Sequence, residues 1–298
     1  MRRFNRSYTQ RVGALDSSFL GMGMPLGGAR LLYEIGAGPT TVQELRVRLG
    51  LDSGYLSRML RGLEKKGYVA VQPDPADRRR RLVELTASGR DLWDDLERRS
   101  EERAHLLLDP LTPRQRDRLN EALATADLLV RAATVTIERV DPAGALARQA
   151  MQRYFAEMDA RFEDGFDPGP IDPDDEASLR LPRGVFVVAV SDGEPVAGGG
   201  VRAYDGGGEV TAEIKRMWVH PQWRGAGLGS RLLRHLEGEA AALGHHVVRL
   251  DTRFVLEEAI AMYERSGYDR IERYNDNPYA THFFRKVLAI PVEDPRMP

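Results

Sequence analysis

The chain has 298 residues, of which 42% are hydrophobic and 30% charged, a composition that favours about two globular domains and excludes a disordered protein. It contains no cysteine, which excludes disulfides, zinc ribbons, iron–sulfur clusters and a cysteine nucleophile, and which is compatible with the cytoplasm. The net charge of −2 conceals two halves of opposite sign: residues 1–140 hold 24 basic and 19 acidic residues, and residues 141–298 hold 19 and 26.

The first half is predicted to be mainly helical, with one short hairpin. The pattern predicts, in chain order, a helix over 4–35 broken near 21–25, short helices from Thr41 to Gly50 and from Asp52 to Gly67, strands over 68–72 and 81–85, and long helices from Thr86 and from Thr112 to about 133. Thr41 with Glu44, and Thr112 with Gln115, have the spacing of capping boxes. The apolar content of the two long helices exceeds what one small domain needs, which suggests a dimer interface.

A short capped helix, a tight turn, a second helix and a basic hairpin together indicate a winged helix-turn-helix. The second helix would enter the major groove of DNA, and an arginine at the hairpin could enter the minor groove. The candidate DNA-binding residues are Ser53, Tyr55, Ser57, Arg58, Arg61 and Arg79. Residues 1–81 hold 15 basic and 7 acidic residues, which favours DNA over the alternative of a winged helix used only for protein contacts.

Four segments of this half resemble the MarR family of transcriptional regulators. They are Leu51-Asp-Ser-Gly-Tyr-Leu-Ser-Arg58, Leu63-Glu-Lys-Lys-Gly67, the wing Asp77-Arg-Arg79 and Leu85-Thr86-Ala-Ser-Gly89. The resemblance covers about residues 4–133 and implies a homodimer that binds double-stranded DNA, expected to be a palindromic operator. It also implies that Asp77 braces Arg79. We therefore assign residues 1–133 to a MarR-like DNA-binding and dimerisation domain.

After about residue 134 the pattern changes to strands with a few helices. The predicted strands cover 135–140, 185–190, 195–204, 209–219, 246–251, 268–274 and 281–287; the predicted helices cover 145–163, about 227–243 and 256–266; a Pro/Asp-rich loop covers 164–184, with turns at 192–193 and 206–208. This order predicts an α/β domain over 134–298 with a central mixed, mostly antiparallel sheet.

The segment from Glu213 to Gly229 is the densest motif, because a strand runs into a Gly-rich turn that opens a helix. Backbone N–H groups of such a turn can approach a phosphate closely. It lacks the Lys-Ser/Thr of a Walker A loop and the spacing of a dinucleotide fold. The pattern Arg224-x-x-Gly227-x-Gly229 resembles motif A of the GNAT acetyltransferase superfamily, and Ala259-Ile-Ala-Met-Tyr263-Glu-Arg-Ser-Gly267-Tyr268 is similar to a helix of the same superfamily.

This second resemblance covers about residues 134–288 and implies acetyl-CoA as the cofactor, with direct transfer of the acetyl group to a primary amine. It implies these cofactor-binding residues: Met217, Trp218, Val219, Arg224, Gly225, Ala226, Gly227, Leu228, Gly229 and Ala259. One departure is Leu256, where many relatives have an asparagine that contacts the cofactor.

The chemistry needs a base for the amine and an acid for the leaving thiolate. The resemblance assigns these roles to Glu213 and Tyr263, against the alternatives of an ion pair between Glu213 and Lys215 or Arg216 and of a packed aromatic ring. The candidate substrate-binding residues are Tyr154, Asn275 and Asp276, whose alternatives are a solvated helix face and a polar turn. Glu157 and Arg161 are also candidates for the edge of the cleft. The six histidines lack metal-ligand spacing, so we expect no metal site.

Three functions fit these observations. The first is a bifunctional protein, a MarR-like transcriptional regulator joined to an N-acetyltransferase that acts on a small amine or a protein amine. The second is a regulator whose GNAT-like domain only senses acetyl-CoA or a metabolite. The third is an acetyltransferase whose winged helix serves only dimerisation. We expect no membrane span and no signal peptide, because no sufficiently long apolar segment is present.

Overall fold

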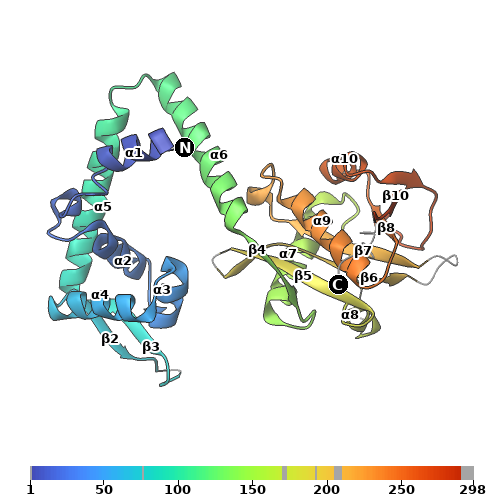
Figure 1. The fold of residues 1–298 in the computed structure, drawn as a ribbon, viewed down its shortest axis with the longest axis horizontal. Coiled ribbons are helices and arrows are strands. Elements are labelled where there is room, and N and C mark those ends of the chain that lie inside the picture. The colour runs from blue at the N-terminus through green and yellow to red at the C-terminus, as the bar shows by residue number, and fades with distance from the viewer. Residues whose placement is uncertain (1, 76, 170–172, 192, 205–209, 290–298) are drawn as a thin grey trace, which may run out of the picture. The chain divides into compact units, whose positions relative to one another are not determined.

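The structure is a computed structural model that describes residues 2–75, 77–169, 173–191, 193–204 and 210–289 (Figure 1). The chain forms two compact units, Met1–Glu121 and Ala122–Pro298, which are described separately below. The predicted turn at 206–208 and residue Asp192 of the other predicted turn lie outside the described residues. Within the described ranges, every helix is too short or too polar to cross a membrane.

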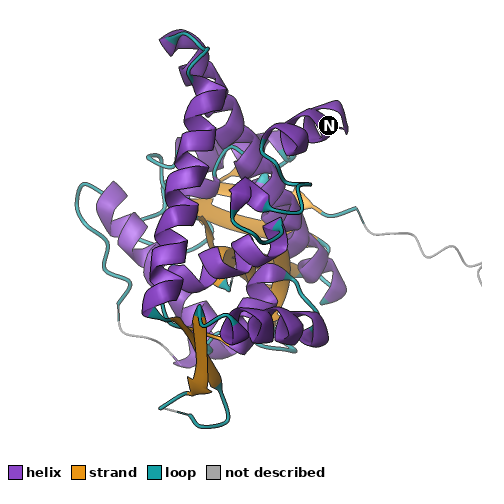
Figure 2. Cartoon of the chain, turned by 90° about the vertical axis from the view of Figure 1, so that its left-hand side faces the viewer, coloured by secondary structure: helices purple, strands orange, loops and turns teal. Residues whose placement is uncertain are grey.

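The N-terminal unit is built from helices and one small sheet. Its elements are α1 (Arg2–Arg11), η1 (Phe19–Gly21), α2 (Leu26–Gly36), β1 (Thr40–Thr41), α3 (Val42–Leu49), α4 (Ser53–Lys65), β2 (Val69–Pro73), β3 (Arg81–Leu85), α5 (Ala87–Leu108) and the first part of α6 (Pro113–Thr134). The sheet has the antiparallel order β1-β3-β2. The sequence pattern predicted the helices from α2 to α6 and both strands of the hairpin, but it missed β1 and η1, and the helix predicted over 4–35 is wrong for residues 12–18, which form turns and bends. The β2–β3 hairpin protrudes from the helices (Figure 2).

Capping residues determine where the two helices of the helix-turn-helix begin and end. The Thr41 hydroxyl accepts from the N–H of Glu44, and the Glu44 carboxylate accepts from the N–H of Thr41, so the predicted capping box is confirmed. Gly50 ends α3 in the left-handed conformation, and Asp52 caps α4. The apolar faces of α2, α3, α4 and β3 then meet in one core, whose buried residues include Leu31, Ile35, Leu45, Leu56, Leu60, Leu63 and Val83.

The start of α5 packs so closely against the hairpin that Gly89 has no room for a side chain. The hydroxyl of Thr86 caps α5 by accepting from the N–H of Gly89 and donates to the carbonyl of Gly67. A β-carbon on Gly89 would lie 1.8 Å from the carbonyl oxygen of Tyr68. The helix can therefore begin against the hairpin only with glycine at this position.

The C-terminal unit is a seven-stranded sheet covered by helices. Its elements are the last part of α6, β4 (Thr136–Val140), α7 (Ala145–Arg161), α8 (Pro173–Ser178), β5 (Gly184–Ser191), β6 (Glu194–Tyr204), β7 (Thr211–Val219), η2 (Pro221–Trp223), α9 (Leu228–Ala242), β8 (Val247–Thr252), α10 (Glu257–Arg265), β9 (Asp269–Ile271) and β10 (His282–Val287). The strand order is β4-β5-β6-β7-β8-β10-β9, and among the described residues only the β7–β8 pair is parallel. The predicted mixed, mostly antiparallel sheet is confirmed; α8 lies inside the segment predicted as a loop.

Alternating side chains of β5 pack the two faces of the sheet. Val185 and Val187 join a core with Leu232, Leu233 and Leu236 of α9, whereas Phe186 and Val188 join Ala147 and Ala150 of α7. This is the period of two expected for a strand buried on both faces. The sheet therefore lies between α9 on one side and α7 on the other.

Candidate functional site

The two parallel strands at the centre of the sheet separate part of the way along their length. β7 pairs with β8 at Thr211, Ala212 and Glu213 only. Beyond them β7 contains Arg216 at a φ of 56° in the left-handed region, and its register against β6 shifts between Gly198 and Gly200. Such a bulge turns a strand away from its neighbour. The backbone N–H and C=O groups of the last residues of β7 therefore form no hydrogen bonds with β8.

The Gly-rich loop follows this strand and leads into α9. Gly225 and Gly227 have φ values of 79° and 77°, which L-residues with a β-carbon rarely adopt. Gly227 is the N-cap of α9, so the first N–H groups of the helix receive no side-chain cap. A β-carbon on either glycine would meet nothing within 4 Å, so the space before the loop is open. This geometry forms a cradle for an anion, where the positive end of the helix dipole adds attraction.

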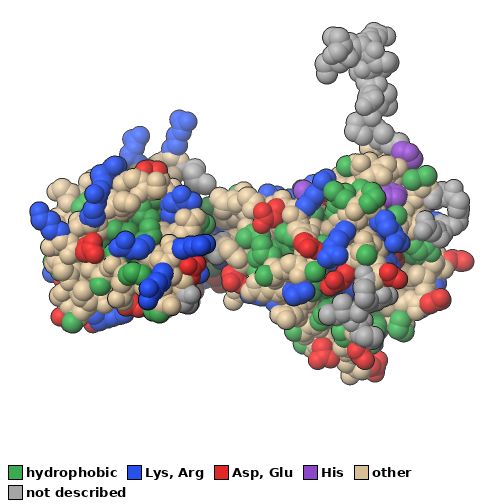
Figure 3. All heavy atoms as spheres, turned by 90° about the horizontal axis from the view of Figure 1, so that it is seen from below, with side chains coloured by type: hydrophobic (Ala, Val, Ile, Leu, Met, Phe, Trp, Pro, Cys, Tyr) green, Lys and Arg blue, Asp and Glu red, His purple; other side chains and the backbone are tan. Residues whose placement is uncertain are grey.

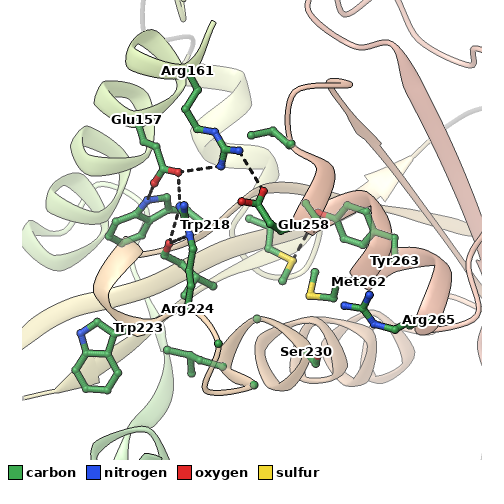
Figure 4. A pocket seen from close by; sticks show the side chains of 18 of the residues that line it. Glu157, Arg161, Trp218, Trp223, Arg224, Ser230, Glu258, Met262, Tyr263 and Arg265 are labelled. Atoms are coloured by element: carbon green, nitrogen blue, oxygen red, sulfur yellow. Dashed lines mark hydrogen bonds and ion pairs between the residues drawn. The ribbon is translucent and has the colours of Figure 1, made fainter. Parts of the chain in front are cut away.

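A cavity of about 550 Å³ lies against this loop, and we call it the loop cavity (Figure 4). Nine of the ten predicted cofactor-binding residues line it: Met217, Trp218, Val219, Arg224, Gly225, Gly227, Leu228, Gly229 and Ala259. The tenth, Ala226, packs instead against the core of the unit. Leu256, the departure from the family pattern, also lines the cavity with an apolar side chain.

Charged side chains from α7 close one side of the loop cavity (Figure 4). Glu157 forms an ion pair with Arg224 and accepts from the indole N–H of Trp218 at 2.8 Å. Arg161 lies 3.5 Å from Glu157 and 3.1 Å from Glu258 of α10. The Arg224 guanidinium also donates to the carbonyl of Val219 at the end of β7. Arg224 therefore ties the strand, the loop and α7 together.

A second cavity, of about 430 Å³, lies beside residues 214–217 of β7 and 250–252 of β8, and we call it the aromatic cavity. Its aromatic lining residues are Tyr154, Phe155, Phe162, Phe166, Tyr263 and Tyr279. Met158, Met217, Leu256, Ala259 and Tyr263 line both cavities, so the two spaces meet there. A group held in one cavity could thus react with a group held in the other next to the Tyr263 hydroxyl.

Tyr263 is a buried tyrosine on α10. Its hydroxyl lies 3.9 Å from the sulfur of Met217, and its ring packs against Tyr268 and Phe284. Burial, together with the nearby Tyr154 and the negative charge of Asp251, raises the pKa of Tyr263 above its usual value of 10. The hydroxyl is therefore protonated at neutral pH.

Glu213 is buried and fully hydrogen-bonded, which does not suit a group that must accept a proton from a substrate. Its side chain is only 1% exposed and belongs to the lining of neither cavity. Oε2 accepts two hydrogen bonds from Arg202, and Oε1 accepts from Lys215, Tyr274 and Asn275. Five donors fill the roughly four lone-pair positions of a carboxylate. The geometry thus favours the ion-pair interpretation, with Arg202 as the main partner.

The predicted substrate residues fall in three different places. Tyr154 lines the aromatic cavity, where burial raises the pKa of its hydroxyl to about 12. Asn275 donates to Glu213 and to Asp251, behind that cavity. Asp276 is exposed and is not among the residues that line either cavity. Glu157 and Arg161, named as candidates for the cleft edge, line the loop cavity.

Sequence reasoning missed several lining residues of the two cavities. In the loop cavity they are Met158, Trp223, Ser230, Glu258, Met262 and Arg265. In the aromatic cavity Asp251 is a carboxylate that no motif indicated. Asp251 lies near the carboxyl end of β8, which is parallel to β7. The sequence does not show that these two strands pair, so it could not indicate Asp251.

In the N-terminal unit, all six candidate DNA-binding residues are exposed. Ser53, Tyr55, Ser57, Arg58 and Arg61 are exposed on α4, and Arg79 is exposed in the hairpin. Figure 3 views this unit from the side of α4 and the hairpin and shows several Lys and Arg side chains there. Asp77 accepts from the backbone N–H of Arg79 at 3.0 Å, so the contact between these two residues acts on the backbone of Arg79.

Two family models match the chain. Residues 149–268 match the acetyltransferase (GNAT) family, and residues 22–80 match the MarR family. The first match includes β7, the Gly-rich loop, α9 and α10. The second includes α2, the helix-turn-helix and β2, and it ends before β3.

Curated acetyltransferases and a curated transcriptional regulator are similar to this chain. The IAA acetyltransferase of Azospirillum brasilense is 32% identical over 134 residues, which are 45% of this chain and 84% of that protein. The uncharacterized N-acetyltransferase YjgM of Escherichia coli is 33% identical over 91 residues, 30% of this chain and 54% of that protein. The uncharacterized HTH-type transcriptional regulator YcgE of Bacillus subtilis is 44% identical over 92 residues, 30% of this chain and 54% of that protein. The chain thus spans about half the length of the last two relatives.

Proposed function

Because this chain belongs to the GNAT acetyltransferase family and carries a MarR-family winged helix ahead of it, we propose that it is an acetyl-CoA-dependent N-acetyltransferase joined to a DNA-binding regulator. The acceptor is a primary amine, small or on a protein, and the transfer is direct. The observation that carries this proposal is the meeting of the loop cavity and the aromatic cavity at Tyr263 and Met217. It lets one protein hold an acyl donor and an acceptor at the same time.

Each part of the loop cavity has a task in this proposal. Acetyl-CoA, when bound, supplies the thioester. The N–H groups of the Gly-rich loop and of the first turn of α9 hold its pyrophosphate. The free backbone groups at the end of β7 pair with its amides, and Arg224 keeps strand and loop in register. Tyr263 donates its proton to the departing sulfur. Measurement of free CoA thiol released in the presence of an amine tests the whole proposal.

Replacing Gly227 with valine should weaken the binding of acetyl-CoA by about 10- to 100-fold. A β-branched residue strains the left-handed backbone by about 1–3 kcal/mol, and each 1.4 kcal/mol is a factor of about ten in affinity. Isothermal titration calorimetry measures the dissociation constant. The matched control is Gly238→Val on the same helix, where the residue is exposed and a β-carbon meets nothing within 4 Å. Equal affinity of both variants would contradict the assignment of the loop.

For the N-terminal unit we propose a homodimer that binds a palindromic operator through α4 and the hairpin. Arg58 is exposed on α4, with its guanidinium 5.8 Å from the centre of the Tyr55 ring. Arg58→Ala should lower operator affinity by about 1–3 kcal/mol at fixed salt, because a base contact is lost. Fluorescence anisotropy with DNA from upstream of its own gene measures this. Arg234→Ala, at an exposed arginine on α9, is the control and should leave affinity unchanged. If neither variant lost operator affinity, the result would favour a winged helix that serves only dimerisation.

One observation favours the alternative in which the acetyltransferase domain acts as a sensor. The guanidinium of Arg131, in the last turns of α6, lies 5.0 Å from the ring centre of Trp223, which lines the loop cavity. Arg231 of α9 donates to the carbonyls of Ala132 and Val135 at the end of the same helix. A ligand in the loop cavity would therefore touch a residue that contacts α6. Repeating the operator titration with acetyl-CoA present distinguishes a sensor from an independent enzyme.

A further inference from the structure

The aromatic cavity has the walls of a site for a flat apolar group. Tyr154, Phe155, Phe162 and Tyr279 each have a ring centroid within 4.8–6.3 Å of the centroid of Phe166. Aromatic rings at such distances hold one another in edge-on and offset arrangements. A volume of about 430 Å³ is within the range of small-molecule sites. The cavity is therefore built for a compact molecule with a ring, held by apolar contact.

Two carboxylates, Asp167 and Asp251, line this cavity; Asp167 is exposed, whereas the side chain of Asp251 is 8% exposed. Its Oδ2 accepts from Lys215 at 3.1 Å and from Asn275, and its Oδ1 accepts from Asn277 at 3.0 Å. These donors occupy three of about four lone-pair positions, so Oδ1 can accept one more hydrogen bond. Asp251 is thus held in place by neighbours and still able to bind a donor.

The cations in the wall of the cavity already have carboxylate partners. Lys215 pairs with Asp251 and Glu213, Arg216 pairs with Asp175, and Arg253 lies 3.0 Å from Asp164. Arg253 also covers the ring of Phe162, with 4.4 Å between the guanidinium carbon and the ring centroid. Asp251 is likewise paired with Lys215, but its Oδ1 accepts only from Asn277, so the remaining acceptor position there suits the N–H groups of an amine and not an anion.

We propose that the acceptor is a primary amine on an aromatic body, and that Asp251 is the catalytic carboxylate that binds its nitrogen and accepts its proton. This inference rests on the proposed acetyltransferase function. The ring occupies the wall around Phe166, and the amine points along β8 toward the junction with the loop cavity at Tyr263. Glu213 then has a structural role, holding Lys215 and Asn275 against Asp251.

In the proposed step, the ammonium gives one proton to the Asp251 carboxylate, and the nitrogen lone pair forms a bond to the thioester carbonyl carbon. The carbon–sulfur bond breaks, and the sulfur takes a proton from the Tyr263 hydroxyl. The second proton of the nitrogen restores Tyr263, and Asp251 releases its proton to solvent. The products are the N-acetyl amine, free CoA thiol and one proton, without any oxidant or reductant.

The test measures thiol release by the full chain with phenethylamine, n-butylamine and spermidine, and inhibition by phenylacetate. We expect kcat/KM for phenethylamine to exceed that for n-butylamine by about tenfold or more, because a buried ring contributes roughly 1.5–3 kcal/mol. Phenylacetate, which replaces the ammonium with a carboxylate, should not inhibit at concentrations that half-saturate the enzyme with the amine. Asp251→Asn should lower kcat/KM by about 100-fold with unchanged affinity for acetyl-CoA. Asp269→Asn, exposed on β9, is the matched control.

A second variant keeps the proposal falsifiable if Asp251→Asn does not fold. Phe166→Ala, at a half-buried position, should raise the KM for phenethylamine and leave that for n-butylamine unchanged. Equal or better turnover of n-butylamine or spermidine, or full activity of Asp251→Asn, would overturn the inference and leave the proposed function intact. Binding of acetyl-CoA without acetylation of any amine would instead overturn the proposed function.

Discussion

Replacing Tyr263 with phenylalanine is expected to lower kcat by about 10²- to 10⁴-fold, the contribution typical of a positioned general acid. The substitution removes only the hydroxyl, because the ring contacts with Tyr268 and Phe284 remain. The affinity for acetyl-CoA should not change. Steady-state thiol release and calorimetry on the same preparation measure the two quantities separately.

The pH dependence gives a second readout for Tyr263. Burial raises its pKa above 10, so the acid form persists as the pH rises to 10 and is lost only beyond that. We therefore expect no fall in wild-type kcat from this group below pH 10. Tyr268→Phe is the control, since Tyr268 is buried nearby and is not among the lining residues of either cavity. If Tyr263→Phe retained the wild-type kcat, Tyr263 would be a packed aromatic ring and no more.

Replacing Glu213 with glutamine is expected to destabilise the C-terminal unit by about 3 kcal/mol, because it removes the buried partner of two cations. Arg202 lies 2.8 Å from Glu213 and Lys215 lies 3.5 Å from it. Arg202 still pairs with Asp175, and Lys215 still pairs with Asp251. The expected loss of free energy of unfolding is therefore at the low end of the range for breaking a buried ion pair.

Urea unfolding in a Trp93→Phe background measures this loss in the C-terminal unit alone. The chain has three tryptophans, and the two that remain, Trp218 and Trp223, both lie in that unit. Glu272→Gln, at an exposed position, is the control and should leave the free energy of unfolding unchanged. A variant Glu213→Gln with wild-type stability and lost acetylation would restore the role of catalytic base to Glu213.

The sequence predicted those parts of the molecule that depend on local chemistry. Thr41 and Glu44 are three residues apart, and the box they form needs nothing else in the chain. The Gly-rich loop is likewise a continuous segment, which is why nearly all of its predicted lining residues line one cavity. α8 was missed because it is a single short helix in a Pro/Asp-rich segment, although the acidic residues of its first turn are a recognisable helix-start signal.

The parts that could not be predicted depend on strand register. Arg202 lies directly opposite Glu213 in the β6–β7 pair, so the ion pair that defines Glu213 arises from a register that no motif encodes. Asp251 enters the aromatic cavity only because β7 and β8 separate after three paired residues. Likewise β1 has two residues and exists only through its pairing with β3.

The early separation of β7 from β8 also bears on aggregation. Strand backbone with unpaired N–H and C=O groups can pair with a strand of another chain, and it usually occurs at the edge of a sheet. Here it occurs between two neighbouring strands of the same sheet, with the Gly-rich loop and α10 lining the adjoining cavity. An extended small molecule with amide groups can add there as a temporary strand, while another folded chain has no margin along which to approach. Unpaired strand backbone inside the sheet is thus open to a small ligand and adds nothing to the outer edges, β4 and β9, where another chain could pair.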